Sequence, residues 1–371
     1  MTEYKQDGCM NRLNELTIAE ARSKLDANEI SSEELTRACL GEINSLNGAL
    51  HVYLEVFEED AIASAKQSDA RRTTSDDRFG VLDGIPLAMK DNILIQGTCA
   101  TAGSKMLANH IAARDATVTR KLKAQGAVIL GRTNMDEFAM GSSTERSAYG
   151  PTKHPRDPER VPGGSSGGSA VAVAAHFCLG ALGSDTGGSI RQPAALCGVV
   201  GLKPTYGRVS RSGLIAMASS LDQIGPLTQT VEDAAIIFAA IHGQDPMDQT
   251  TSDEKPFVPS WTEKLTGVRV GLPRQAWGEG MSRGVRDRVS EAVQVLESLG
   301  ATIRDVELPY VDEALSVYYV LMPCEVSANL ARFDGMRYGR REPALPLFET
   351  YTRSRSEGLG IEVRRRILLG T

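Results

Sequence analysis

Two glycine- and serine-rich segments, separated by one apolar run, constrain this chain more than any other feature. They read PGGSSGGS at residues 162–169 and SDTGGSIRQP at residues 184–193. The run between them, residues 170–182, reads as a buried helix, which argues against a flexible linker. Glycine lets the backbone approach a ligand closely, and consecutive N–H groups in such turns can bind an anion. The two segments therefore predict a site at which the backbone contacts a ligand.

The chemistry of these segments could be phosphate binding or acyl transfer by serine. A Walker-type phosphate loop needs a lysine, and neither segment contains one. The stretch from Gly163 to Gly167 fits the G-x-S-x-G turn of serine hydrolases, which requires a later histidine. The later histidines, His176 and His242, lie in the apolar run and at a helix end, which favours core or surface roles. Lysine is the alternative base, because burial lowers its pKa; Lys90 ends an apolar strand, although most lysines are solvated charges.

An alternation of helix, glycine and apolar strand recurs along the chain and predicts an α/β fold. Capping-box patterns begin helices at Thr17 and Ser31. The other expected helices cover residues 61–72, 115–125, 230–242 and 283–299, and the expected strands cover residues 85–90, 127–130, 268–272 and 301–306. The best linker candidate is the polar segment 244–259, which we interpret as a surface loop inside one domain.

Charge and composition exclude several classes of protein. Lys and Arg number 41 against 47 Asp and Glu, a net charge of −6, which argues against a basic nucleic-acid surface. Residues 1–11 contain no apolar core of a secretory signal, and no apolar run reaches the ~20 residues of a membrane span. The cysteines form no C-x-x-C pair and fit a reducing compartment. We therefore expect a cytoplasmic protein, or one of an organelle matrix.

Taken together, the two segments and Lys90 resemble the signature of the amidase family, whose members use a Ser–cis-Ser–Lys triad. The resemblance covers residues 16–371, and Lys90, Ser165 and Ser189 all fall at the family's spacing. It implies that Ser189 is the nucleophile and that Ser165, after a cis peptide bond, relays the proton. Lys90 would then be the base.

The resemblance also implies an oxyanion hole. Its donors would be the backbone N–H groups of Thr186, Gly187 and Gly188, together with that of Ser189. Such donors, aimed at the developing charge, stabilise the tetrahedral intermediate of acyl transfer.

The implied fold is α/β: the amidase-signature fold, with a mixed β-sheet core flanked by helices on both faces. We expect a single amidase domain over residues 1–371. It would comprise a helical N-terminal region (12–72), a catalytic core (80–243) and a remainder (260–371). The family normally continues past the last residues of this sequence, so we expect the C-terminal end of the fold to be missing.

Three further motifs, at residues 134–143, 332–339 and 364–371, resemble the A subunits of glutamyl-tRNA(Gln) amidotransferases. That resemblance implies hydrolysis of glutamine to glutamate and ammonia. The B subunit would use the ammonia, with ATP and Mg²⁺, to convert misacylated Glu-tRNA(Gln) to Gln-tRNA(Gln) in protein biosynthesis. The C subunit would complete a heterotrimer. No cofactor or metal is expected in this chain, and its acidic charge suits a polypeptide that leaves tRNA to the B subunit.

The resemblance further implies a glutamine pocket of a Tyr, an Arg and a later Asp. Tyr318 of the Tyr318-Tyr319 pair matches the first, and Arg366, ahead of Arg365, matches the second. An arginine fork suits the α-carboxylate of the substrate, whereas the residues alone favour a core tyrosine and a surface arginine cluster. The pocket Asp would lie beyond residue 371, and Arg146 stands where the family has a small or amide residue.

Two alternatives stay open at this point. One is a stand-alone amide hydrolase of the same fold, against which the motifs at residues 332–339 and 364–371 argue. The other is an inactive fragment that only binds the partner subunits. The complete set of triad residues argues against the second.

Overall fold

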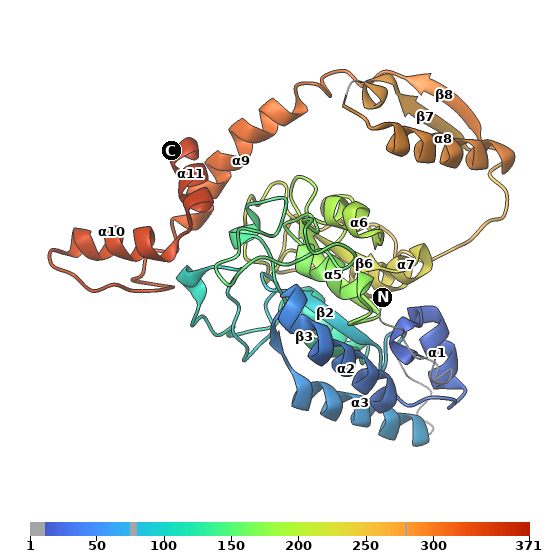
Figure 1. Ribbon diagram of the computed structural model, residues 1–371, viewed down its shortest axis with the longest axis horizontal. Coiled ribbons are helices and arrows are strands. Elements are labelled where there is room, and N and C mark those ends of the chain that lie inside the picture. The colour runs from blue at the N-terminus through green and yellow to red at the C-terminus, as the bar shows by residue number, and fades with distance from the viewer. Residues whose placement is uncertain (1–11, 75–79, 279) are drawn as a thin grey trace, which may run out of the picture. The chain divides into compact units, whose positions relative to one another are not determined.

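The computed structural model describes residues 12–74, 80–278 and 280–371 (Figure 1). Residues 1–11, where the sequence argues against a secretory signal, lie outside the described residues. The chain divides into two compact units, the first made of Met1–Phe257 with Pro323–Thr371 and the second of Val258–Met322. The first boundary falls inside the linker candidate at residues 244–259. That the whole chain acts as one amidase domain stays a prediction.

A six-stranded mixed sheet forms the core of the first unit, in the order β1-β3-β2-β4-β6-β5. Strand β2 pairs in parallel with β3 and β4, and the other pairs are antiparallel. Every residue of β2, β4 and β6 is buried. Because side chains alternate between the faces of a sheet, both faces are covered, and the expected mixed sheet with flanking helices is confirmed. The strands are β1 Tyr53–Val56, β2 Pro86–Lys90, β3 Val128–Thr133, β4 Gly180–Asp185, β5 Val200–Gly201 and β6 Gln223–Thr228.

The capping boxes that the sequence predicts are present in the first two helices. The side chains of Thr17 and Ser31 accept the N–H groups of Glu20 and Glu34. The helices of the first unit are α1 Ile18–Asp26, α2 Ser32–Leu50, α3 Glu58–Thr73, α4 Thr117–Ala124, α5 Gly167–Ala174, α6 Arg191–Cys197, α7 Val231–Ile241, α10 Leu347–Gly358 and α11 Ile361–Gly370, with 3₁₀ turns at Leu13–Glu15, Lys105–Leu107 and Glu137–Ala139.

The second unit contains a two-stranded parallel sheet. Its strands, β7 Arg269–Pro273 and β8 Thr302–Val306, are joined through the 3₁₀ turn Arg274–Trp277 and helix α8 Arg283–Ser298. These bounds lie within one residue of the sequence predictions. Helix α9 Ala314–Leu330 begins in this unit and ends in the first.

The apolar run at residues 170–182 is not one helix, so that prediction is wrong. Helix α5 ends at Ala174, His176 adopts a left-handed conformation with φ of 56°, and strand β4 begins at Gly180. The left-handed residue stops the helix. Strand β4 then lies between β2 and β6, where burial on both faces requires continuous apolar residues. Apolar content alone does not distinguish such a strand from a buried helix.

Asp115 does not cap the helix that follows it, which corrects a second prediction. Helix α4 begins at Thr117 after Ala116. The Asp115 carboxylate instead accepts the Gln96 N–H at 2.8 Å and pairs with Lys123 at 2.9 Å. The carboxylate ties the end of the helix to a neighbouring loop.

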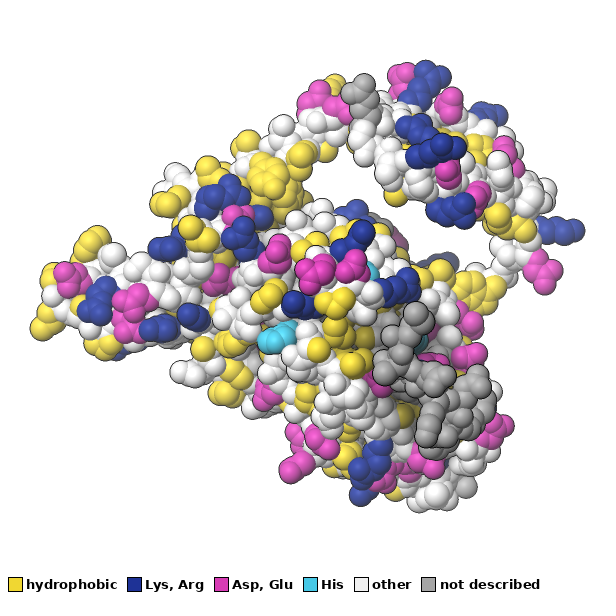
Figure 2. All heavy atoms as spheres, in the orientation of Figure 1, with side chains coloured by type: hydrophobic (Ala, Val, Ile, Leu, Met, Phe, Trp, Pro, Cys, Tyr) yellow, Lys and Arg dark blue, Asp and Glu magenta, His cyan; other side chains and the backbone are white. Residues whose placement is uncertain are grey.

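The surface carries charges of both signs. Figure 2 shows acidic and basic side chains mixed over the visible face, in keeping with the modest net charge of −6. Within the described ranges, every helix is too short or too polar to cross a bilayer.

Candidate active site

Lys90 and Ser184 lie together because neighbouring strands end at the same edge of the sheet. Lys90 is the last residue of β2, Ser184 is the last but one of β4, and the two strands are parallel, with Met89 opposite Leu182. Strand β6 runs antiparallel to β4 and starts at this edge, with Gln223 opposite Asp185. The loops at this edge carry the predicted site residues.

The Lys90 amine is fully buried and has three oxygen neighbours. Its Nζ lies 2.8 Å from Ser165 Oγ, 2.9 Å from Ser184 Oγ and 3.3 Å from the Ser184 carbonyl oxygen. Asn92 Nδ2 donates to the same Ser184 hydroxyl at 2.9 Å. A neutral amine has two hydrogens and one lone pair. The two hydrogens satisfy Ser184, so the lone pair faces the hydroxyl of Ser165.

Burial sets the protonation state of Lys90. Removal from water disfavours the ammonium form and lowers the pKa of Lys90 to about 7, against the opposing attraction of Asp136, Asp185 and Asp222. A lysine with this pKa is half neutral near neutral pH. It can therefore act as a general base without a histidine.

Ser165 is fixed in the first glycine-serine segment by backbone contacts. The Gly164–Ser165 peptide bond is cis, where the resemblance placed it. The Asp136 N–H donates to the Ser165 carbonyl at 3.3 Å, and the Gly164 N–H donates to Gln192 Oε1 at 2.9 Å. Gly164 packs so closely that a Cβ there would lie 2.2 Å from Asp136 Oδ2. These contacts hold the Ser165 hydroxyl against Lys90.

Ser189 lies in the second segment, beside the first. Its carbonyl accepts the Ser166 N–H at 3.1 Å, and the residue is nearly buried. Among the described residues, none makes a hydrogen bond with the Ser189 hydroxyl, Ser165 included. The structure thus brings Lys90 and Ser165 into direct contact and leaves the Ser189 hydroxyl available to a substrate.

Asp185 organises the turn that carries Ser189. Its carboxylate accepts the N–H groups of Gly188 at 2.8 Å and Ile190 at 3.0 Å, and it forms an ion pair with Arg191 at 2.9 Å. Burial alone would raise the pKa of Asp185, but the hydrogen bonds from Arg191 and Ile190 hold it below its usual value. The turn is therefore shaped around an ionised carboxylate.

The four backbone donors expected for an oxyanion are not equivalent. The Gly188 N–H is already donated to Asp185. Those of Thr186, Gly187 and Ser189 make no hydrogen bond to another residue in the part of the chain that the structure describes. These three donors are the ones open to a ligand.

The predicted pocket residues lie on two helices. Arg366, on α11, is only 8% exposed, and its Nε donates to Glu362 at 2.8 Å. The Arg365 side chain is 51% exposed and pairs with the same carboxylate. Burial therefore favours Arg366. Tyr318 lies on α9 in the second unit, with its ring 5.6 Å from that of Tyr319, and its role stays a prediction.

Arg146, the departure from the family pattern, lines a cavity of about 310 Å³ with Glu137 and Glu362. Its own N–H donates to Asp136 at 3.1 Å. Glu137 is buried and accepts the Gly360 N–H at 2.9 Å, just before α11. The loop that carries Arg146 is thus connected to the helix of Arg366.

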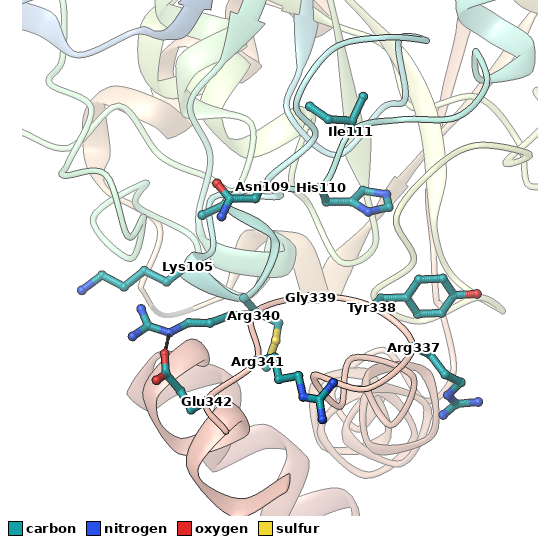
Figure 3. A pocket seen from close by; sticks show the side chains of 12 residues that line it. Lys105, Asn109, His110, Ile111, Arg337, Tyr338, Gly339, Arg340, Arg341 and Glu342 are labelled. Carbon is teal, nitrogen blue, oxygen red and sulfur yellow. Dashed lines mark hydrogen bonds and ion pairs between the residues drawn. The ribbon is translucent and has the colours of Figure 1, made fainter. Parts of the chain in front are cut away.

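A second cavity, of about 600 Å³, lies between residues 105–111 and 337–342 and contains none of the predicted catalytic residues. Figure 3 shows that its cationic side chains Lys105, Arg337 and Arg341 point in different directions, and that Arg340 pairs with Glu342. Arg337 is paired with Asp334. The cations do not converge on one anion.

The sequence alone missed several residues that shape the site. Ser184 and Asp185 belong to the second segment, and their placement directly before the turn was the available signal. Asn92, Asp136 and Asp222 gave none, because their partners are distant in the sequence. Within the described ranges, no group of three or more His, Cys, Asp or Glu residues could hold a metal ion.

Comparisons with known proteins agree with this geometry. The amidase family model matches residues 34–371. The A subunit of glutamyl-tRNA(Gln) amidotransferase from Thioalkalivibrio sulfidiphilus is 53% identical over 363 residues, which are 97% of this chain and 74% of that protein. The crystal structure of the Thermotoga maritima A subunit has 41% identity and a TM-score of 0.76, and the match covers 98% of this chain and 76% of that one. Peptide amidase from Stenotrophomonas maltophilia has 33% identity and a TM-score of 0.81, over 96% and 75% of the chains.

Proposed function

The chain belongs to the amidase family, and on that basis we propose that it is the glutamine-hydrolysing A subunit of a glutamyl-tRNA(Gln) amidotransferase. The observation that carries the proposal is the buried Lys90 amine, whose lone pair faces the Ser165 hydroxyl at 2.8 Å. The names of relatives at about half identity support the substrate.

The proposed reaction begins with proton transfer along the triad. Neutral Lys90 takes the proton of Ser165, which takes that of Ser189 as the Ser189 Oγ attacks the side-chain amide carbon of glutamine. Bound substrate would bring the two serine hydroxyls into register, since catalytic hydrogen bonds often tighten only in the substrate complex. The tetrahedral intermediate forms with a negative oxygen.

That oxygen would be bound by backbone donors of the second segment. The unused N–H groups of Thr186, Gly187 and Ser189 support this, whereas the Gly188 N–H is engaged by Asp185. Preorganised donors of this kind cost no rearrangement as charge develops.

The intermediate then collapses to an acyl-enzyme. The Lys90 ammonium returns its proton through Ser165 to the departing nitrogen, and ammonia leaves while a γ-glutamyl ester remains on Ser189. Water attacks this ester with the same relay as base, releasing glutamate and the free Ser189 hydroxyl. Each turnover therefore consumes one glutamine and one water and yields glutamate and ammonia.

Substrate recognition would involve Arg366 and Tyr318. The guanidinium of Arg366 would bind the α-carboxylate of glutamine bidentately, and it is already oriented by Glu362. Tyr318 would contribute its hydroxyl.

In this proposal ammonia passes to the B subunit, where ATP and Mg²⁺ activate the glutamyl group of Glu-tRNA(Gln), and the C subunit completes the complex. The net charge of −6 suits a polypeptide that leaves tRNA to a partner.

The test compares substrates and assemblies. Ammonia release is measured for the chain alone and with the B and C subunits, on glutamine and on simple aliphatic and aryl amides. We expect glutamine to be preferred and its hydrolysis to need or be raised by the partners. Preference for simple amides by the isolated chain would instead identify a stand-alone amidase. Partner binding without hydrolysis of any amide would identify an inactive binding protein.

A further inference from the structure

Two buried carboxylates, rather than one, hold the turn that carries Ser189. Asp185 binds the turn from inside through the N–H groups of Gly188 and Ile190. Asp222 binds its first residue from the other side, because its Oδ1 accepts the Thr186 hydroxyl at 2.7 Å. The three N–H groups that stay unused lie on residues between or beside these two anchors.

The position of Asp222 follows from the sheet. Strands β4 and β6 are antiparallel, and their last paired residues at this edge are Asp185 and Gln223. Thr186 and Asp222 are the next residues on each side, beyond the end of the backbone ladder. Their side-chain hydrogen bond therefore continues the pairing of the two strands into the turn.

The remaining lone pairs of Asp222 are also engaged. The Met217 N–H donates to Oδ2 at 2.9 Å, and the Ala218 N–H donates to Oδ1 at 3.3 Å. Asp222 is only 3% exposed. A buried carboxylate with three donors is a rigid acceptor, and charge-assisted hydrogen bonds of this kind are the stronger ones.

We propose that Asp222 is a positioning residue for amide hydrolysis: it holds Thr186, and through it the unused backbone N–H groups, in the orientation that binds the oxyanion. The inference rests on the proposed function and adds a residue to it. Asp222 touches no reacting atom. It acts through the Thr186 hydroxyl alone, whereas its contacts with Met217 and Ala218 stabilise the preceding turn.

The charges around Asp222 give a second readout. Lys90 attracts its carboxylate, and Arg211, paired with Asp248 at 2.9 Å, lies on the side of a cavity of about 210 Å³. Burial raises the pKa of Asp222 to about 6. The anion in turn stabilises the Lys90 ammonium. Removing its charge should therefore lower the pKa of Lys90, which loss of packing alone would not do.

The experiment compares Thr186→Val, Thr186→Ser and Asp222→Asn in the full chain with its partner subunits. Thr186→Val removes the hydroxyl at nearly constant volume, and we expect kcat to fall at least about tenfold with KM little changed, from the loss of a hydrogen bond to a charged group. Thr186→Ser should recover most of that loss. Asp222→Asn should lower kcat similarly and move the acid limb of the kcat/KM profile to lower pH. Ser219→Ala, which lines the same cavity without touching the turn, is the matched control.

A second measurement separates this inference from the proposed function. Phenylmethanesulfonyl fluoride places a sulfonyl oxygen where the oxyanion would sit. The Ser189 Oγ displaces fluoride, and the proton passes to the relay. Labelling is followed by intact mass, and circular dichroism checks folding. If wild type labels at Ser189 but releases no ammonia from glutamine, the proposed substrate is wrong and the labelling rates decide the role of Asp222.

The inference is overturned if folded Thr186→Val keeps the wild-type kcat and labelling rate, or if only its KM changes. It is also overturned if Thr186→Ser loses as much as Thr186→Val, or if Ser189 is not labelled in wild type. A slower rate in Thr186→Val and Asp222→Asn, with recovery in Thr186→Ser, supports it.

Discussion

The amine nitrogen of Lys90 lies 2.8 Å from the hydroxyl oxygen of Ser165, and both residues are fully buried. Two further oxygens, both of Ser184, take up the hydrogens of a neutral amine. The contact therefore has a direction, with the lone pair of Lys90 toward Ser165. A base shielded from water in this way needs neither histidine nor metal to accept a proton near neutral pH.

The first prediction concerns the pH dependence of hydrolysis. Lys90 must be neutral to act as base, and burial lowers its pKa to about 7. Below that pH the ammonium form predominates, so kcat/KM for glutamine should fall about tenfold per pH unit. A pH profile of kcat/KM measures this. An acid limb near pH 4 would assign the essential base to a carboxylate instead.

The second prediction separates stability from activity at Lys90. Lys90→Met should abolish hydrolysis but leave the fold at least as stable at pH 7, because the native state no longer contains a desolvated amine. The lowering of the pKa from 10.5 to about 7 sets an upper limit of about 5 kcal/mol for the gain, at about 1.36 kcal/mol per pH unit.

The gain at Lys90 has a definite pH window. Between pH 7 and 10.5 the unfolded wild-type chain binds a proton at Lys90 that the folded chain releases, so wild-type stability rises with pH. The advantage of Lys90→Met should thus be largest at and below pH 7 and disappear toward pH 10.5. Urea unfolding at several pH values measures it. A variant less stable than wild type at pH 7 would contradict the account.

The third prediction tests the close packing behind Ser165. A Cβ added at Gly164 would lie 2.2 Å from Asp136 Oδ2 and 2.8 Å from the Ser143 nitrogen. We expect Gly164→Ala to destabilise the fold by about 3 kcal/mol through overpacking, and to lower hydrolysis. The control is Gly48→Ala in α2, where no atom lies within 4 Å and alanine should stabilise by about 0.5–1 kcal/mol. Equal stabilities of the two variants would refute the packing argument.

The fourth prediction concerns substrate binding by Arg366. Arg366→Lys keeps the charge but loses the bidentate fork, so the KM for glutamine should rise about 10- to 100-fold with little change in kcat. Arg365→Lys, in the more exposed neighbour, should change KM by at most about threefold. Steady-state kinetics on glutamine distinguish the two. The larger effect at Arg365 would reverse the assignment.

Features set by neighbours in the sequence were the ones that could be predicted from it. The capping boxes at Thr17 and Ser31 need only residues three positions apart. Strand β2, ending at Lys90, was readable because a short apolar run precedes a charged residue. Strand β6 was not, because Gln223–Thr228 contains Gly and Pro and becomes a strand through pairing with β4 and β5.

The candidate site divides in the same way. The roles of Lys90, Ser165 and Ser189 were proposed from motifs, and the contact of the first two has a simple geometric basis. Ser184 could not be identified as a partner of Lys90, since 94 positions separate them and only the parallel pairing of β2 and β4 brings them together. The link from Asp222 to Thr186 depends likewise on the pairing of β4 with β6.

The central claim is that Ser189 is the nucleophile of glutamine hydrolysis. The most direct measurement is ammonia release from glutamine by Ser189→Ala, in the complex with the B and C subunits, beside wild type. We predict a fall of at least about 10³-fold, with the complex intact by gel filtration, because no other group would form the acyl-enzyme. Ammonia release at the wild-type rate would contradict the account.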